Sequence, residues 1–288
     1  MVDPPDTYQQ ARLSALGLRL RQIREQAGVS ARSIAARADI NQSTLSRIET
    51  GKIRPSVDVL DRIIAVMGIE TAAEELHDLL GVLHTEAEHL RRYARKGFGA
   101  LQNQIGALER RTRLVRAFQP SLVPGLLQTA EYAAQALSHV YYVTSTDLAQ
   151  AAHGRIERQS ILHEPGREFR YVITESALLY WVCPARVMLA QVDRLRELAT
   201  LPTVRLGILP QDRPMPNFPQ HGFTLYDDER VQIELHTSHV KLTAPADVSV
   251  YAATYAEYER AAVHGEEAET VLRRVMQEYR RRADMRDA

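Results

Sequence analysis

The sequence predicts an all-α N-terminal domain of five helices followed by an α+β C-terminal domain. Up to residue 83, apolar residues recur at helical spacing in five short segments, each bounded by a capping residue or a glycine. After Pro165 the pattern changes to short β-rich runs that alternate with amphipathic helices. A chain of 288 residues is also long for a single domain, so we expect two.

The N-terminal helices are delimited by residues that start or stop helices. Glycine follows three of them, and serine, threonine or asparagine precedes others as an N-cap. In chain order these boundary residues are Gly28, Ser30, Asn41 or Gln42, Gly51, Ser56, Gly68 and Thr71. Short helices joined by such tight turns predict a compact helical domain.

Five segments follow from these patterns. Residues 1–12 are polar and are expected to be a disordered tail, and residues 13–83 form the helical domain. Residues 84–118 read as a helical connector that ends before Pro120, residues 119–283 as the α+β domain, and residues 284–288 as a charged tail. Strands are expected at 168–174, 204–209, 223–226, 231–235 and 240–243, and helices at 128–138, 148–163, 185–200, 247–264 and 266–283.

The composition of the chain indicates in which compartment the protein works. The first twelve residues lack the apolar core of a signal peptide, and no apolar run approaches the ~20 residues that cross a bilayer. The single Cys183 excludes an internal disulfide. We therefore expect a cytoplasmic protein that does not bind a membrane.

The net charge of the whole chain is zero, but its charges are unevenly distributed. Residues 13–68 hold nine Lys/Arg against five Asp/Glu, a local excess of positive charge that would attract the phosphate backbone of a nucleic acid.

The segment from Ser30 to Arg54 has the features of two helices crossing closely. Ala35 supplies the small residue that a close crossing needs, and Leu45 and Ile48 point inward from the following helix. The opposite face of that helix, at about residues 42–50, is short, polar and able to form hydrogen bonds. Such a helix fits the major groove of DNA, where Gln pairs with adenine and Arg with guanine.

Residues 16–83, and most specifically the run STLSRIETGKIRPS from Ser43 to Ser56, resemble the Xre and phage-repressor family of helix-turn-helix regulators. The resemblance implies binding to double-stranded DNA, normally as a homodimer with recognition helices ~34 Å apart. By the same resemblance Gln42, Ser43 and Arg47 meet base edges. The residues implied to lie near phosphates are Ala31, Arg32, Thr44, Ser46, Lys52 and Arg54.

Two further positions are structural in this comparison. Arg24 and Glu49 match family positions that form an internal ion pair, so we expect them to hold the fold rather than contact DNA. The tight turn between the two helices, usually a glycine in the family, carries Asp39 here. Aspartate tolerates left-handed backbone better than most residues, so the turn is expected to survive, although wider.

The C-terminal part resembles the long domain of uncharacterised function in actinobacterial Xre regulators of the WhiJ-like type. The signature is FQPSLVPGLLQTAEYAAQAL from Phe118, with RIERQSIL, VITESALL, LAQVDRLREL, VRLGILP and VQIEL following in order up to Leu235. This resemblance implies regulation of development or antibiotic production. It also implies a small partner protein encoded nearby, sometimes described as toxin–antitoxin-like.

Catalysis finds little support in the sequence, and no cofactor or metal is expected. His84 and His89 point apart on a helix, and the odd spacing of His236 and His239 sends them to opposite faces. Glu175 and Glu234 are carboxylates on or beside strands, for which salt bridges to Arg155, Arg158 or Arg170 are the plain interpretation. An enzyme would require Glu175, Glu234 and a histidine to gather around an open pocket.

The expected function is a transcription regulator whose N-terminal domain reads DNA and whose C-terminal domain dimerises and senses a partner protein or ligand. Three alternatives remain open: a plain helical bundle, an antitoxin-like protein that mainly sequesters its partner, and an enzyme in the second domain. Several aromatic side chains suit either a ligand pocket or core packing: Tyr132, Tyr171, Tyr180, Trp181 and Tyr226. The loop from Gln211 to Gly222 is long enough for a lid or a partner surface.

Overall fold

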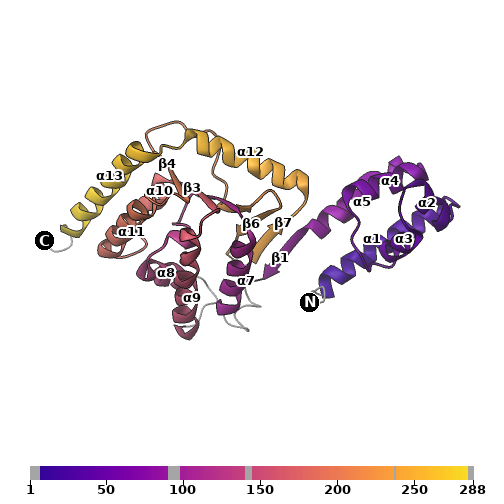
Figure 1. Ribbon diagram of the computed structural model, residues 1–288, viewed down its shortest axis with the longest axis horizontal. Coiled ribbons are helices and arrows are strands. Elements are labelled where there is room, and N and C mark those ends of the chain that lie inside the picture. The colour runs from indigo at the N-terminus through magenta and orange to yellow at the C-terminus, as the bar shows by residue number, and fades with distance from the viewer. Residues whose placement is uncertain (1–6, 90–97, 140–144, 237, 285–288) are drawn as a thin grey trace. The chain divides into compact units, whose positions relative to one another are not determined.

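The computed structural model describes residues 7–89, 98–139, 145–236 and 238–284 (Figure 1). The chain divides into two compact units, Met1–Glu86 and Ala87–Ala288. The predicted fold class is confirmed: the first unit is helical, and the second combines a mixed sheet with helices. In the described part of the chain, none of the helices is both long enough and apolar enough to cross a bilayer.

The first unit consists of five helices around one apolar core. They are α1 (Thr7–Gln26), α2 (Ala31–Arg37), α3 (Gln42–Glu49), α4 (Val57–Met67) and α5 (Glu70–His84). Ser30 and Ser56 cap α2 and α4 by accepting hydrogen bonds from the N–H groups of Ser33 and Val59. Leu16, Leu20, Ile34, Leu45, Ile48, Leu60, Ile63 and Leu76 are among the fully buried side chains. Capping and helical periodicity therefore place these helices where the sequence predicts them.

Helix α1 begins earlier than predicted. Residues 7–12, expected in a disordered tail, are helical, and the rest of that tail lies outside the described residues. The extra turns are held by tertiary contact, because the Gln10 side-chain amide donates to the Gly51 carbonyl oxygen at 2.9 Å. A polar turn gains this anchor only once the chain has folded back on itself, so the local sequence does not reveal it.

The predicted helical connector at 84–118 is only partly helical. Within its described residues, α7 (Phe98–Arg111) is a helix, but β1 (Thr85–His89) and β2 (Leu114–Gln119) are strands. Strand β2 alternates Val115 and Ala117 inward with Arg116 between them, and it pairs on both sides. A run of six residues that mixes apolar and basic types matches the helical and strand periods almost equally. Residues 114–119 form a strand rather than a helix because they pair with β3 and β5.

The strands form one mixed sheet in the order β1-β7-β6-β5-β2-β3-β4. Beyond β1 and β2 they are β3 (Glu168–Thr174), β4 (Val204–Leu209), β5 (Phe223–Tyr226), β6 (Arg230–Glu234) and β7 (Ser238–Leu242). Strands β2, β3 and β4 are parallel to one another, β5 is antiparallel to both β2 and β6, and β7 is antiparallel to β6. Strand β6 consequently runs in the same direction as β2, and the carboxyl ends of β2, β3, β4 and β6 share one edge.

Helices cover both faces of this sheet (Figure 1). One face carries Phe118, whose ring stacks at 3.9 Å on Tyr258 of α12 (Pro245–Ala261). The opposite face packs against α11 (Ala185–Leu198) and α13 (Gly265–Asp284). The remaining elements are η1 (Gly125–Leu127), α8 (Ala130–Ser138), α9 (Ser145–Glu157), η2 (Arg158–His163) and α10 (Glu175–Leu179). The sheet is thus a buried central layer whose ends stay accessible.

Candidate nucleic-acid interface

Helix α3 presents a polar face to solvent and an apolar face to the core. Leu45 and Ile48 are at most 2% exposed and fix the helix against its neighbours. The exposed side chains on the other side include Gln42, Ser43 and Arg47. All three predicted base-contacting residues therefore lie on one accessible surface, the arrangement that entry into a major groove requires.

The predicted phosphate contacts surround this face. Arg32, Ser46 and Lys52 are exposed, and Ala31 and Thr44 are half-buried. Arg54 differs from the rest, because its Nη1 donates to the Leu83 carbonyl oxygen at 3.1 Å at the end of α5. This bond, which links residues far apart in the sequence, assigns Arg54 a structural contact that sequence analysis did not find.

The turn between α2 and α3 is tight despite the absence of glycine, so the expectation of a wider turn was wrong. Asp39 adopts left-handed backbone, with φ of 52°, and the Ile40 N–H bonds to the Ala35 carbonyl oxygen at 3.0 Å. Ala35 and Ala38 are both buried, so two small side chains bring the helices together. Aspartate therefore occupies the conformation that the family pattern assigns to glycine, as its tolerance of left-handed backbone predicts.

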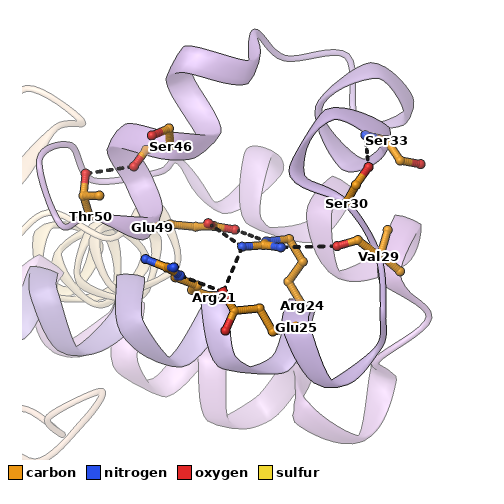
Figure 2. Close-up of polar contacts among 9 residues, drawn as sticks. All are labelled: Arg21, Arg24, Glu25, Val29, Ser30, Ser33, Ser46, Glu49 and Thr50. Carbon is orange, nitrogen blue, oxygen red and sulfur yellow. Dashed lines mark hydrogen bonds and ion pairs between the residues drawn. The ribbon is translucent and has the colours of Figure 1, made fainter.

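Arg24 and Glu49 form an ion pair between the end of α1 and the end of α3 (Figure 2). Arg24 Nε and Nη2 donate to the two Glu49 oxygens at 2.6 and 3.1 Å, and Nη1 donates to the Val29 carbonyl oxygen at 3.3 Å. Hydrogen bonding to Glu49 raises the pKa of Arg24 above its ordinary value. Through these bonds, Arg24 of α1 joins Glu49 at the end of α3 to Val29, which follows α1.

Two glycines close to α3 allow the chain to pack tightly. A Cβ on Gly17 of α1 would overlap the Ile48 carbonyl oxygen, so the two helices approach to backbone contact. Gly51, with φ of 64°, ends α3 in left-handed backbone, and Thr50 Oγ1 donates to the Ser46 carbonyl oxygen at 2.8 Å just before it. Sequence analysis assigned Gly51 its role but missed Gly17, whose only signal is a glycine inside a helical pattern.

The carboxylates considered for catalysis lie in different surroundings. Glu175 is buried, accepts hydrogen bonds from Arg274 at 2.6 and 2.8 Å, and also accepts one from the Gln211 N–H. Glu234 instead lines a cavity at the end of β6, which Glu175 does not reach. The expected partners Arg155, Arg158 and Arg170 bond elsewhere, to Gln128, Glu109 and Glu168.

The prediction that His236 and His239 point to opposite faces was wrong. His236 and His239 line the same cavity, because His236 lies in the turn after β6 and His239 lies on β7 rather than along the same strand. The side chains of His84 and His89 lie outside the described residues. Where side chains are described, histidine, cysteine and carboxylate groups do not gather in threes that would hold a metal ion.

Family comparisons divide the chain at the same place as its structure. Residues 15–79 match a helix-turn-helix domain, which covers the first unit. Residues 102–274, more than half of the chain, match a domain of unknown function, DUF5753. The chain belongs to the DUF5753 family. That membership defines the second unit without assigning it an activity, and the helix-turn-helix match accounts for the arrangement of α2 and α3.

No curated protein matches this chain. Similar solved structures include Nuc of Salmonella typhimurium, a phospholipase D family member, at 11% identity, 63% of this chain, 97% of that chain and TM-score 0.34. NucT of Helicobacter pylori gives 11%, 63%, 98% and 0.35, and the archaeal chromatin protein TrmBL2 gives 14%, 71%, 69% and 0.32. These TM-scores are too low to assign this chain a fold or an activity.

Proposed function

We propose that this DUF5753 protein is a transcription regulator of the Xre type that binds duplex DNA in a sequence-specific way through α3. The observation that carries the proposal is the exposed polar face of α3, held above the buried Leu45 and Ile48. Side chains on that face match the donors and acceptors of base edges: Arg47 suits guanine, and Gln42 suits adenine. Ser43 completes the base-contacting set.

Affinity for the DNA phosphate backbone comes from the residues around the polar face of α3. Arg32 and Lys52 provide positive charge beside the polar face of α3, and Ser46 and Thr44 provide hydroxyl groups. Ala31, the first residue of α2, belongs to the same predicted phosphate-contacting set. Each neutralised phosphate releases counterions, so binding weakens steeply as salt rises.

One helix-turn-helix unit reads only a few base pairs, so the proposal includes a homodimer. Two copies place their α3 helices in successive major grooves, ~34 Å apart. The unit from Ala87 on dimerises and receives the signal that changes this spacing. The site of action is the nucleoid in the cytoplasm. A small partner protein, expected from the resemblance, is a separate prediction that copurification from the native host tests.

The test is a binding measurement on the full-length protein. A duplex selected from a random pool is titrated by fluorescence anisotropy at several salt concentrations. Arg47→Ala is expected to cost roughly 1–3 kcal/mol at the selected site and to relax selectivity at one base. Lys52→Ala is expected to weaken binding to all duplexes alike and to lower the salt slope by about 1.

A matched arginine substitution controls for the loss of positive charge. Arg21 is exposed on α1, pairs with Glu25 and is not one of the predicted DNA contacts, so Arg21→Ala should bind like the wild type. A wild-type protein without salt-sensitive preference for any duplex would overturn the proposal. Unchanged selectivity in Arg47→Ala would remove Arg47 from base recognition.

A further inference from the structure

A cavity of about 800 Å³ opens in the second unit at the carboxyl ends of three strands. Residues 120–122, which follow β2, Ser176, which follows β3, and residues 234–236 at the end of β6 line its walls. Open sheets with parallel strands bind ligands at this edge, because the loops there diverge and leave a crevice. The volume suits a drug-sized organic molecule.

The inner end of this cavity continues onto the face of the sheet. A smaller cavity of about 80 Å³ shares several lining residues with it, namely Ile105, Leu122, Arg155, Gly222 and Glu234. Tyr171 of β3 and Tyr226 of β5 form its floor, and Glu109 of α7 and Arg158 line its other side. Because the two cavities share these residues, the smaller cavity adjoins the outer one and places polar side chains at its inner end.

Two neighbouring arginines at this inner end differ in their partners. Arg158 donates to Glu109 at 2.6 Å and to Gln102 at 2.9 Å, so its charge is balanced. Arg155 donates only to the neutral Gln128, at 2.8 Å, and has no carboxylate within ion-pair distance among the described residues. Both arginines bury an Nε atom that lacks a hydrogen-bond partner. Arg155 thus lines the cavity without a direct ion pair to a described carboxylate, although Glu109 and Glu234 also line it.

The surroundings keep Arg155 charged and leave a second donor unused. Burial lowers the pKa of Arg155 to about 10, so the guanidinium stays protonated at neutral pH. The charge of Glu234 acts on it through space without a hydrogen bond. The Tyr171 hydroxyl is buried and lacks a partner, and burial raises its pKa, so it keeps its proton. The Arg155 Nε and the Tyr171 hydroxyl are buried donors without acceptors, which is costly unless an acceptor enters.

The outer cavity offers an apolar lining. Leu101 and Ile105 of α7, Leu137 of α8 and Leu235 beside β6 contribute side chains, and Tyr180 lies at its wall. Tyr180 and Leu235 are 49% and 47% exposed, so both offer apolar surface to the cavity. Covering them with an apolar group would bury surface that water now contacts.

We propose that this cavity binds an amphipathic organic anion, with its charged head against Arg155 and the Tyr171 hydroxyl and its apolar body along the leucine-lined wall. The proposal deepens the function above, because it names the chemical class of the signal that the second unit receives. Only the role of the ligand as a regulatory signal rests on the proposed DNA-binding function. Binding itself is measured without DNA, so failure of one proposal is distinguishable from failure of the other.

The first test uses two fluorescent probes on the full-length protein. The anion 8-anilinonaphthalene-1-sulfonate is compared with N-phenyl-1-naphthylamine, which has the same rings without the sulfonate. Arg155→Gln is expected to weaken binding of the sulfonate about tenfold and to change binding of the neutral probe less than about twofold. Glu234→Gln is expected to strengthen sulfonate binding, because it removes a negative charge beside the head. Opposite signs at two neighbouring positions would not arise from a general loss of structure.

Thermal unfolding separates a ligand contact from a structural one. Arg155→Gln breaks no ion pair, so its Tm without ligand should equal or exceed that of the wild type. The neighbouring Arg158→Gln leaves Glu109 buried without a partner and should lower the Tm. Octanoate and octyl phosphate are expected to displace the sulfonate probe, and the stronger competitor identifies a carboxylate or phosphate head. Equal displacement by 1-octanol, or unchanged sulfonate binding by Arg155→Gln, would overturn the proposal.

Discussion

Arg24 and Glu49 are 25 positions apart, yet their side chains determine how α3 is held. The Glu49 side chain is 8% exposed and the Arg24 side chain 13%, so neither is fully solvated if its partner is lost. The pair contacts no predicted DNA-binding residue directly. Its contribution to DNA binding is therefore through the orientation of α3.

Replacing Arg24 by alanine is expected to destabilise the first unit strongly. Arg24→Ala leaves the Glu49 carboxylate without a counterion and should lower the free energy of unfolding by roughly 3 kcal/mol, measured by urea denaturation. In the control, Arg21→Ala removes an exposed ion pair and should leave the unfolding midpoint unchanged. Equal midpoints for the two variants would show that the Arg24 pair is not a structural anchor.

The sequence predicted the polar face of α3 but not the hydrogen bond that Arg54 forms with α5. The polar face of α3 follows from the spacing of Leu45 and Ile48, which is a local property. Arg54, in contrast, bonds to a carbonyl 29 positions away, and no local pattern marks that bond. Arg54 is nevertheless exposed, so its phosphate contact stays a prediction beside this structural bond.

At the scale of elements, the contact between α1 and α3 depends on Gly17. Glycine in a helix interior costs about 1 kcal/mol relative to alanine, so its presence here requires a packing reason. The reason is the close approach of the Ile48 and Glu49 carbonyl groups to the Gly17 Cα. The helix that carries Arg47 is thus seated directly on the backbone of α1.

Two glycine-to-alanine substitutions test this contact. Gly17→Ala should destabilise the first unit and weaken binding to the selected duplex, because a Cβ there displaces α3. Gly81→Ala in α5 meets open space and should stabilise the unit by roughly 0.5–1 kcal/mol. Thermal unfolding and anisotropy measure both variants. Stabilisation of both would mean that α3 does not rest on Gly17.

Element boundaries were predictable where caps exist and unpredictable where pairing decides. Ser30 and Ser56 cap their helices as predicted, since a cap acts within a few residues. Strand β2 was assigned to a helical connector because its six residues carry no cap and no clear period. Its strand conformation is stabilised by β3 and β5, which lie far along the chain.

At the scale of the molecule, each unit has its own hydrophobic core. The first unit buries Leu45 and its neighbours, and the second buries separate clusters on the two faces of the sheet. Cores that share no residues are expected to unfold in separate transitions. DNA binding and ligand binding would then reside in parts of the chain that are stable in their own right.

Calorimetry of a core variant tests this separation. Leu45 is fully buried, so Leu45→Ala should lower the stability of the first unit by roughly 2–5 kcal/mol and shift only its transition. The transition of the second unit, and its binding of the sulfonate probe, should not change. A single transition that shifts as a whole would show that the two units unfold together.

The sequence by itself determined the five N-terminal helices, the polar face of α3 and the α+β class of the second unit. These features depend on periodicity, capping and turn residues, which act over a few positions. Only the tertiary structure decided which charges are balanced. Arg158 forms an ion pair with Glu109, while Arg155, three positions earlier, donates its side-chain hydrogen bond to the neutral Gln128. Whether a buried group has a partner is settled by segments that are distant along the chain and become neighbours only on folding.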